Sequence, residues 1–250
     1  MSTLILKRPD EIEKIRASAR IVAEALDLAG TLIAPGVTTG EIDSRIEELI
    51  RSRGAVPSFK GYRGFPAATC ISVNEVVVHG IPGERRLEQG DIVGIDVGAY
   101  LDRYHGDGAR SFPVGAVSAE AAKLLVVAQE ALLAGIAAIR AGGRLGAISH
   151  AVQTHAEANG FSVVRDLVGH GIGRSLHEDP QVPNFGPATA GPVLRPGIVL
   201  AIEPMVNAGT WEVRTEADHW TVVTLDGKFS AHFEHTVVVR EDGPEILSLL

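Results

Sequence analysis

The segment 164–180, VRDLVGHGIGRSLHEDP, concentrates residues that can bind a metal ion or transfer a proton. It contains two histidines, His170 and His177, and an imidazole can serve either purpose near neutral pH. Glycine allows backbone conformations and close approaches that other residues resist, so the glycines around His170 predict a turn that aims its ring. These glycines are Gly169, Gly171 and Gly173. The segment therefore predicts a functional site rather than part of the core.

Four carboxylates elsewhere in the sequence occur where predicted strands could bring them together. Asp96 and Asp107 flank the polar segment LDRYHG, a spacing typical of a hairpin that brings both acids to one side of a sheet. Considered singly, each of these two is more commonly a turn or cap residue. Glu203 follows the apolar run IVLAI, and Glu234 stands beside the apolar strand in SAHFEHTVVV. Buried carboxylates rarely occur without a partner or a metal ion.

The four acids and His170 form a coherent set of metal ligands. Without cations, four adjacent carboxylates raise one another's pKa values and oppose folding through repulsion and desolvation. Two divalent ions would cancel the four charges. Oxygen-rich ligation with one imidazole suits Mn²⁺, Fe²⁺, Co²⁺ or Zn²⁺ and disfavours a thiolate zinc site. Two such ions close together can lower the pKa of a shared water toward neutrality, which is the chemistry of a metal-dependent hydrolase.

Positioning these residues requires a framework, and the apolar periodicity predicts one built from helix pairs and strands. A helix should begin near Pro9 and Asp10, where Asp10 and Glu13 have the spacing of a capping box, and should end at Gly30. Thr38 and Glu41 have the same spacing and should begin a second helix. The predicted helices after the first span about 38–54, 118–140 and 145–159.

The chain also resembles an internal duplication. A shift of 106 positions aligns the two helix pairs and places Leu26 on Leu132. A shift of 107 aligns LEQGDIVGID with LRPGIVLAIE, two predicted strands that end at Asp96 and Glu203. Chance repetition of a common helix-pair pattern is the alternative. We expect an α+β fold in which helices cover one face of a curved, mostly antiparallel sheet. Residues 1–250 should form one catalytic domain, with internal halves at about 10–113 and 118–240.

Composition narrows the classes of function. The net charge of -8 and the isoelectric point near 5.6 argue against nucleic acid as a partner, because binding phosphates requires clustered Lys and Arg. The single cysteine, Cys70, excludes an internal disulfide framework and an all-thiolate zinc site. No window approaches the roughly 20 apolar residues of a membrane span, and the N-terminus lacks the pattern of a signal peptide. We therefore expect a cytoplasmic protein.

Several strings, taken in order, resemble the successive signatures of the type I methionine aminopeptidases. They are SVNEVVVHGIP, GDIVGIDVGAYLDRYHGDGARSF, GHGIGRSLHEDP, LAIEPM and FEHT, and they spread across most of the chain. The resemblance implies a pita-bread fold, two related halves around a dinuclear metal site, and removal of N-terminal methionine before a small second residue. It implies five metal ligands, with the second and the last bridging the two ions: Asp96, Asp107, His170, Glu203 and Glu234.

The resemblance also implies two catalytic histidines, His79 and His177. From the chemistry of such a site we expect His177 to hydrogen-bond the developing oxyanion, His79 to contact the scissile amide, and Glu203 to relay a proton toward the leaving nitrogen. For His79 alone, the alternative is a histidine with an ordinary structural role at a strand end. The remaining histidines match no ligand position and are interpreted as surface or supporting residues: His105, His150, His155, His219, His232 and His235.

A pocket for a methionine side chain needs apolar and aromatic walls. By the same resemblance these walls are Tyr62, Phe65, Cys70, Leu176 and Trp220, with Phe59 at the entrance and with His79 and His177 also contacting the substrate. Relatives commonly have Phe at position 176 and Tyr at position 65, so this pocket should be less aromatic. Asn74, Val76 and Ser230 resemble a site for one monovalent cation, Na⁺ or K⁺, although Asn and Ser near strand ends are usually turn residues.

Two other readings stay open on the sequence. An X-Pro aminopeptidase or prolidase shares the five ligands, but such relatives usually carry an additional N-terminal domain. A non-catalytic pita-bread binding module should lack one or more of the ligands. We expect a monomer that acts on nascent polypeptides beginning with Met and contacts ribosomes transiently, with neither a specific nucleic-acid partner nor a membrane.

Overall fold

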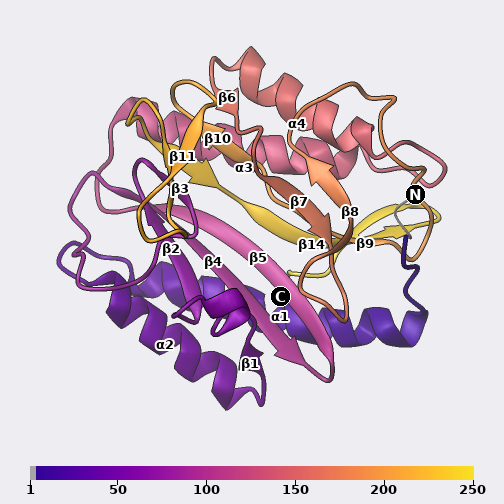
Figure 1. The fold of residues 1–250 in the computed structure, drawn as a ribbon, viewed down its shortest axis with the longest axis horizontal. Helices are drawn as coiled ribbons and strands as arrows, with labels where there is room; N and C mark the ends of the chain where they lie inside the picture. The colour runs from indigo at the N-terminus through magenta and orange to yellow at the C-terminus, as the bar shows by residue number, and fades with distance from the viewer. Residues whose placement is uncertain (1–3) are drawn as a thin grey trace.

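The computed structural model describes residues 4–250, and residues 1–3 of the predicted domain lie outside this range. Figure 1 shows a large sheet crossed by helices, with α1 and α2 along one half and α3 and α4 along the other. The helices are α1 (Pro9–Leu32), α2 (Thr39–Ser52), α3 (Ala119–Ala137) and α4 (Gly146–Ala158), with a short 3-10 helix at Tyr62–Gly64. All four α-helices were predicted, and their ends agree with the structure to within a few residues.

The first helix begins at Pro9, as predicted, but its capping box and its end differ from the prediction. The N-cap is Arg8, and the carboxylate that closes the capping box belongs to Glu11 rather than Glu13 and accepts the Arg8 backbone N–H at 3.0 Å. The helix then continues past Gly30 to Leu32. A glycine inside a helix costs only about 1 kcal/mol relative to alanine, and the buried face of α1 outweighs that cost.

The later helices begin as the sequence predicts. Thr38 Oγ1 accepts the Glu41 N–H at 3.1 Å, and the Glu41 carboxylate accepts the Thr38 N–H at 2.7 Å. This reciprocal pair is the predicted capping box of α2. Ser118 caps α3 in the same way, with its hydroxyl accepting the Ala121 N–H at 3.1 Å.

The main sheet runs in the order β1-β4-β5-β14-β9-β7-β8, with β2 also paired to β4 and β15 to β14, and these pairings are antiparallel. Its strands are β1 (Val56–Pro57), β2 (Thr69–Val73), β4 (Ile92–Leu101), β5 (Tyr104–Pro113), β7 (Val168–Gly171), β8 (Glu178–Pro183), β9 (Val199–Ile202), β14 (Glu234–Arg240) and β15 (Gly243–Ile246). Smaller sheets contain β3 (Val76–Val78), β6 (Ser162–Val163), β10 (Met205–Asn207), β11 (Val213–Thr215), β12 (Val222–Thr224) and β13 (Ser230–His232).

The centre of the main sheet is the pair β5 and β14, which lie far apart in sequence. β4 lies beside β5 and β9 lies beside β14, so the two strands that were aligned by sequence flank the centre at equivalent places. β4 and β5 form the predicted hairpin, and Asp102 and Arg103 make its two-residue turn at φ +49° and +71°. The boundaries of the two predicted halves stay a prediction.

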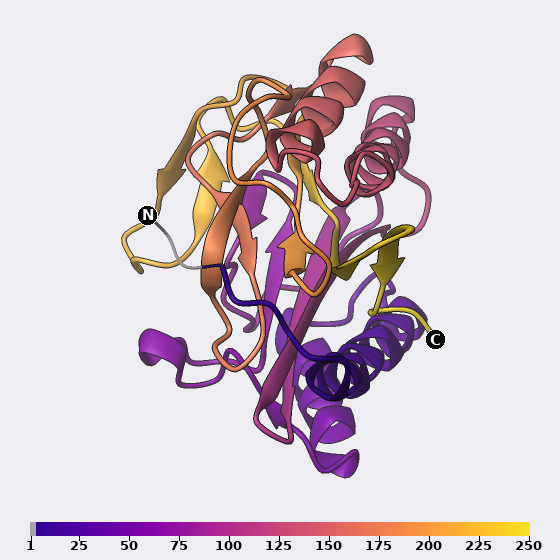
Figure 2. The same ribbon diagram turned by 90° about the vertical axis from the view of Figure 1, so that its right-hand side faces the viewer.

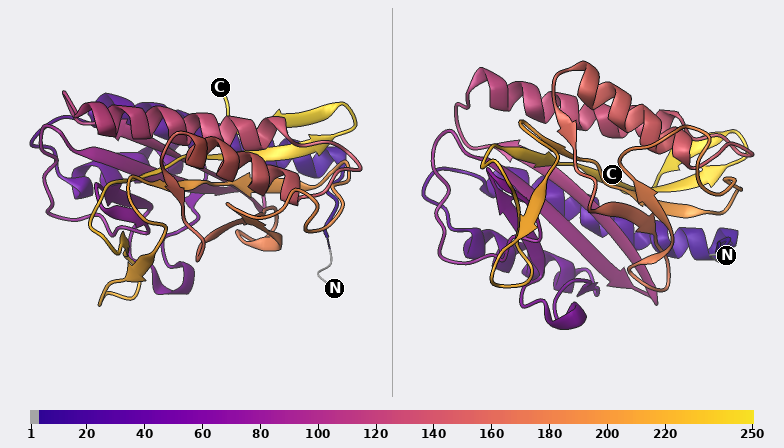
Figure 3. Two further views of the ribbon diagram at one scale, coloured as in Figure 1. Left: turned by 90° about the horizontal axis from the view of Figure 1, so that it is seen from above. Right: turned by 45° about the horizontal axis from the view of Figure 1, so that its top comes forward.

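The helices pack on one face of the sheet and leave the other face to the functional residues. Figure 3, at left, shows α1, α3 and α4 along one side, with the loops and short strands on the other. Figure 2 shows α1 and α3 nearly end-on, one at each half of the sheet. The expected α+β arrangement is therefore confirmed. Within residues 4–250, helices of the length and apolarity needed to cross a membrane are absent.

Candidate metal centre and adjoining pocket

The four predicted acids lie on the central strands of the sheet. Ala109 of β5 pairs with Asp96 of β4 on one side and with Glu234 of β14 on the other. Directly paired residues point to the same face, so these two carboxylates flank a small alanine. Asp107 precedes Ala109 by two residues and therefore shares that face, and Glu203 follows β9 immediately. The hairpin prediction is confirmed, with the two aspartates diagonal rather than directly opposite.

A threonine fixes the central strands to each other at the position of Asp107. The Thr236 hydroxyl accepts the Asp107 backbone N–H at 3.0 Å and donates to the Asp107 carbonyl oxygen at 2.7 Å. Thr236 lies in β14, two residues after Glu234, and its side chain is fully buried. This pair of bonds fixes the two strands that carry Asp107 and Glu234, two carboxylates far apart in the sequence.

His170 reaches the acids from a strand rather than from the predicted turn. It lies in β7, opposite Ala201 of β9. The glycines beside it serve close packing: a side chain at Gly171 would overlap the Asp179 carbonyl of β8, and one at Gly169 would overlap the Ala201 carbonyl. The prediction of a turn was wrong because glycine's tolerance of crowding, not its conformational freedom, is used here.

The orientation of the His170 ring indicates that a cation belongs between it and the acids. Its Nδ1 lies 2.9 Å from the Gly171 carbonyl oxygen, which can only accept, so Nδ1 carries the hydrogen. The lone pair of Nε2 then faces Glu203 Oε1 at 3.4 Å and Asp107 Oδ2 at 3.9 Å. Ionised carboxylate oxygens are also electron-pair donors, so a positive ion can satisfy the lone pairs of the ring and of the acids together.

Burial and the state of the buried oxygens support the same conclusion. Ligand atoms of Asp107, His170 and Glu234 lie within 4.8 Å of one another, and these side chains are 4%, 6% and 2% exposed. Asp96 Oδ1 and Glu234 Oε1 are buried without a hydrogen-bond partner among the described residues. Buried polar atoms are normally satisfied. The five residues Asp96, Asp107, His170, Glu203 and Glu234, here called the ligand cluster, therefore fit divalent cations.

The charge balance of the ligand cluster also calls for cations. Burial raises the pKa of Asp96 to about 7, and burial followed by repulsion from neighbouring carboxylates raises the pKa of Asp107 and Glu234 well above the ordinary range. The pKa of Glu203 is raised for the same reasons. Burial lowers the pKa of His170 to about 3, so the ring is neutral at pH 7 and free to ligate.

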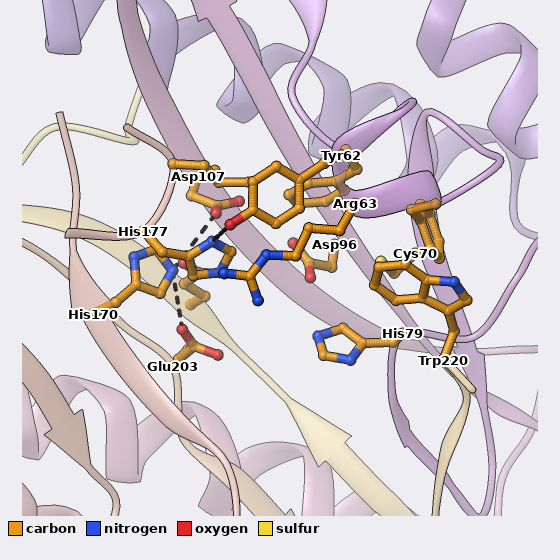
Figure 4. Close-up of a pocket in the computed structure, with 14 residues that line it drawn as sticks. Tyr62, Arg63, Cys70, His79, Asp96, Asp107, His170, His177, Glu203 and Trp220 are labelled. Atoms are coloured by element: carbon orange, nitrogen blue, oxygen red, sulfur yellow. Dashed lines mark hydrogen bonds and ion pairs between the residues drawn. The ribbon is translucent and has the colours of Figure 1, made fainter. Parts of the chain in front are cut away.

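The two predicted catalytic histidines flank the ligand cluster. The His177 ring lies 4.3 Å from the His170 ring, and His177 Nδ1 is hydrogen-bonded to the Tyr62 hydroxyl at 2.9 Å. His79 follows β3 at φ +59°, a left-handed conformation uncommon for residues other than glycine. Burial lowers the pKa of both rings, to about 4 for His79. Figure 4 shows His177 beside His170, and His79 near Trp220 across the cavity.

The predicted pocket residues line the same cavity as the ligand cluster. Phe65 and Trp220 meet edge to face, with ring centroids 5.1 Å apart. Leu176 is 3% exposed and packs in a cluster with Phe65 and Cys70 while also facing the cavity. The pocket walls are Phe59, Tyr62, Phe65, Cys70, Leu176 and Trp220, here called the apolar pocket. Figure 4 places Cys70 and Trp220 at the end of the cavity opposite His170 and Glu203.

The three residues predicted to hold a monovalent cation lie outside this cavity. The Asn74 side chain donates to Asp91 Oδ1 at 2.8 Å and accepts the Ile92 N–H at 3.0 Å, as a turn residue would. The backbone carbonyl oxygen of Asn74 accepts the Ser230 N–H at 2.8 Å, and Val76 begins β3 nearby in the sequence. The structure thus brings Asn74 and Ser230 together. The side-chain amide of Asn74 is already hydrogen-bonded to Asp91 and to the Ile92 backbone.

Two residues of the site were not singled out by the sequence. Arg63 lines the cavity and lies over the Tyr62 ring at 5.4 Å, and it carried no motif of its own. His232 is 4% exposed, and its Nε2 lies 4.0 Å from Glu203 Oε2 with no hydrogen bond from the described residues. Its position two residues before Glu234 was the available signal, although His232 ends β13 and Glu234 begins β14.

Comparisons with known proteins extend over nearly the whole chain. The sequence pattern of metallopeptidase family M24 matches residues 13–241. Methionine aminopeptidase 1 of Bacillus subtilis is 54% identical over 245 residues, covering 98% of this chain and 99% of that protein. The solved methionine aminopeptidase of Thermotoga maritima matches with TM-score 0.98 and 45% identity, covering 99% of this chain and 100% of that one. The prolidase of Pyrococcus furiosus shares the fold at TM-score 0.81 and 24% identity, and the match covers 66% of that chain.

Proposed function

The chain belongs to metallopeptidase family M24, and we propose that within this family it is a type I methionine aminopeptidase with the pita-bread fold. Its reaction is the hydrolysis of the peptide bond after an N-terminal methionine when the second residue is small. One observation carries the proposal: the ligand cluster and the apolar pocket are the two ends of one cavity. A methionine side chain in the pocket therefore places the first peptide bond beside the ligand cluster.

Family membership implies divalent metal ions, and the ligand cluster offers them hard oxygens and one neutral imidazole. We propose two ions per chain, which the five residues of the ligand cluster would hold, with Asp107 and Glu234 as the shared ligands, and with Mn²⁺, Fe²⁺, Co²⁺ or Zn²⁺ as suitable metals. When bound, such ions polarise a carbonyl group and lower the pKa of a water molecule. The residues that would hold these ions line the end of the cavity opposite Cys70 and Trp220, where the free α-amino group of the substrate would lie.

The side chains of this protein orient the substrate and move the proton. We assign to His177, which is hydrogen-bonded to Tyr62, the donation of a hydrogen bond to the oxyanion as it develops. We assign to His79, on the opposite wall, a contact with the scissile amide. We assign to Glu203, next to the neutral Nε2 of His170, the transfer of a proton toward the leaving nitrogen.

The alternatives account less well for these observations. A prolidase-type enzyme uses the same ligands, but the close relatives over the full length of this chain are named methionine aminopeptidases. A binding module that had lost its metals should lack part of the ligand cluster, and here all five residues line one cavity. The match to prolidase at 24% identity supports the shared fold only.

The partners and surroundings follow from this chemistry as part of the proposal. The substrates are nascent polypeptides in the cytoplasm. The enzyme acts on them as a monomer that contacts ribosomes transiently. Neither nucleic acid nor a membrane is required. A Na⁺ or K⁺ ion at Asn74, Val76 and Ser230 completes the proposal, supported by the adjacency of Asn74 and Ser230.

A peptidase assay tests the proposed function. Purified protein with Mn²⁺, Fe²⁺ or Co²⁺ added should cleave Met-Ala-Ser and leave Met-Leu-Ser and Ala-Pro-Ala nearly intact, with the metal content measured on the same samples. Cleavage of Ala-Pro-Ala alone would support the X-Pro alternative. Absence of both metal binding and cleavage would support the non-catalytic module.

A further inference from the structure

A buried ion pair joins the start of the chain to the strand that follows His177. Lys7 Nζ donates to Glu178 Oε2, and the side chains of Lys7 and Glu178 are only 3% and 6% exposed. The Lys7 backbone N–H also donates to the Gly197 carbonyl at 2.7 Å, which holds the segment before α1 against the sheet. Long charged side chains are rarely buried this far, so the pair requires a reason.

The second oxygen of Glu178 organises the loop at 172–177, which connects β7 to β8 and carries His177. Glu178 Oε1 accepts the Ser175 N–H at 3.2 Å, and the Gly173 N–H donates to the Ser175 carbonyl at 3.2 Å. A side chain at Gly173 would begin 2.7 Å from Glu178 Oε1 and would overlap the Lys7 side chain. A side chain at Gly173, the third glycine of the histidine segment, would therefore force the Lys7–Glu178 pair to shift.

The same loop is tied to the start of α1 a second time. Arg174 Nη2 donates to Glu11 Oε1 at 3.2 Å, and the His105 N–H donates to the Gly173 carbonyl at 2.8 Å. These contacts hold the loop from its outer side. On its inner side the His177 ring faces the cavity, hydrogen-bonded to Tyr62.

We propose that the Lys7–Glu178 pair is a positioning device that sets the orientation of His177 in the cavity. Lys7 neutralises the buried Glu178 carboxylate, and Glu178 in turn fixes the Ser175 backbone two residues before His177. The inference rests on the proposed function, because in that function His177, the residue that the pair positions, donates a hydrogen bond to the oxyanion. A buried ion pair adds little net stability compared with a well-packed apolar pair. Its hydrogen bonds instead fix the positions of the groups around it, here the Ser175 backbone. The pair should therefore act on kcat rather than on KM.

Three variants separate positioning from simple stability. Lys7→Met leaves Glu178 charged and unpaired, so its melting temperature and its kcat for Met-Ala-Ser should both fall, kcat by about tenfold, with KM and metal content nearly unchanged. Lys7→Met with Glu178→Gln keeps an acceptor for the Ser175 N–H and should recover both quantities. Lys7→Met with Glu178→Met removes that acceptor, so it should recover the melting temperature while kcat stays low. Lys123→Met, a lysine replaced on the exposed face of α3, is the control.

Histidine NMR supplies a readout that does not depend on turnover. In protein with ¹⁵N-labelled histidine, the His177 ring resonances should move in Lys7→Met and in the double variant that carries Glu178→Met. They should return in the double variant that carries Glu178→Gln. Equal kcat and equal His177 resonances in the two double variants would overturn the proposal, as would a Lys7→Met protein with normal kcat. If wild type fails to cleave Met-Ala-Ser, the proposed function falls, and the NMR comparison still decides whether the pair orients His177.

Discussion

Asp107 and Glu234 are the most deeply buried carboxylates of the ligand cluster and the most costly to leave without a cation. We expect Asp107→Asn and Glu234→Gln to lower bound metal below one ion per chain and to abolish measurable turnover, because each replacement removes a shared negative charge. Metal analysis and Met-Ala-Ser kinetics measure both effects. Asp43→Asn is the control, since Asp43 accepts hydrogen bonds from Thr69 outside the cavity. Two tightly bound ions and normal kcat in either variant would show that the ligand assignment is wrong.

Leu176 determines the shape of one wall of the apolar pocket. It faces the cavity and belongs to the same buried hydrophobic cluster as Phe65 and Cys70. Leu176→Phe places an aromatic ring where it can contact the substrate sulfur, an interaction of about 0.3 to 1.5 kcal/mol. We expect KM for Met-Ala peptides to fall a few-fold with kcat nearly unchanged, because ground state and transition state gain the contact alike.

The outcome for Leu176→Phe also distinguishes the two sides of this residue. Kinetics on Met-Ala and norleucine-Ala peptides, with a melting curve of each protein, give the comparison, and discrimination against norleucine should increase. If the ring instead enters the core beside Phe65, overpacking should lower the melting temperature and kcat together. That result would contradict the role of Leu176 in recognising methionine.

At the scale of one element, α1 depends on Glu11 for its first turn. The Glu11 carboxylate accepts the Arg8 N–H, then the Tyr104 hydroxyl at 2.7 Å and Arg174, and these bonds lower its pKa to about 2 against the opposing effect of burial. Because the folded-state pKa lies below the unfolded value, this stabilisation is present above about pH 4.3 and is lost as the pH falls toward 2. We expect Glu11→Gln to cost roughly 1 to 2 kcal/mol at pH 7.

Melting curves of Glu11→Gln and wild type at pH 7 and pH 3 test this dependence. The difference in melting temperature should be largest at pH 7 and should shrink at pH 3. Glu13→Gln is the matched control, because Glu13 lies on the same helix, is 63% exposed and contacts Arg16 on the surface. An equal difference at both pH values would show that the charge of Glu11 is not what stabilises α1.

The elements also show how far the sequence predicts the site. The α2 capping box and the β4–β5 hairpin were predictable because Thr38 with Glu41, and the spacing of Asp96 and Asp107, are local patterns. The Arg8 cap and the strand position of His170 were not, because each depends on contacts with distant residues. Lys7 and Arg63 belong to the same group: nothing adjacent in the sequence marks them, and only the fold brings them to the cavity or to the loop beside it.

For the whole molecule, the ligand cluster should stabilise the fold when metal ions are bound and destabilise it when they are removed. Burial raises the pKa of Asp96 to about 7 in the metal-free fold, above roughly 3.9 for an unfolded aspartate. Because the pKa of Asp96 is higher in the folded state, its contribution to stability is fully present when the pH is below the pKa of the unfolded chain. This contribution is lost as the pH rises through about 7, because the folded protein must then bury an ionised carboxylate. In metal-free protein, Asp96→Asn should therefore melt higher than wild type at pH 8, on the order of 5 °C, and with little difference at pH 4.

Comparing two metal-free proteins cancels the titration of the buried histidines, which depends on pH in the opposite direction. The measurement is a melting curve at each pH after treatment with a chelator. With Mn²⁺ restored, wild type should melt above Asp96→Asn at pH 8, because bound ions compensate the carboxylate. A variant that melts below wild type at pH 8 without metal would contradict the assignment of an uncompensated buried charge to Asp96.

The position of β14 in the chain has a consequence for how the protein is made. β14 joins β5 to β9, and it carries Glu234, the last of the five ligands to be synthesised. During translation, the first half can pair β4 with β5 and present Asp96 and Asp107, but neither the sheet nor the ligand cluster is complete until β14 has left the ribosome. A chain released before that strand would lack Glu234 and the link between β5 and β9. Catalytic competence therefore arises only at the end of synthesis, so prematurely terminated chains should be inactive.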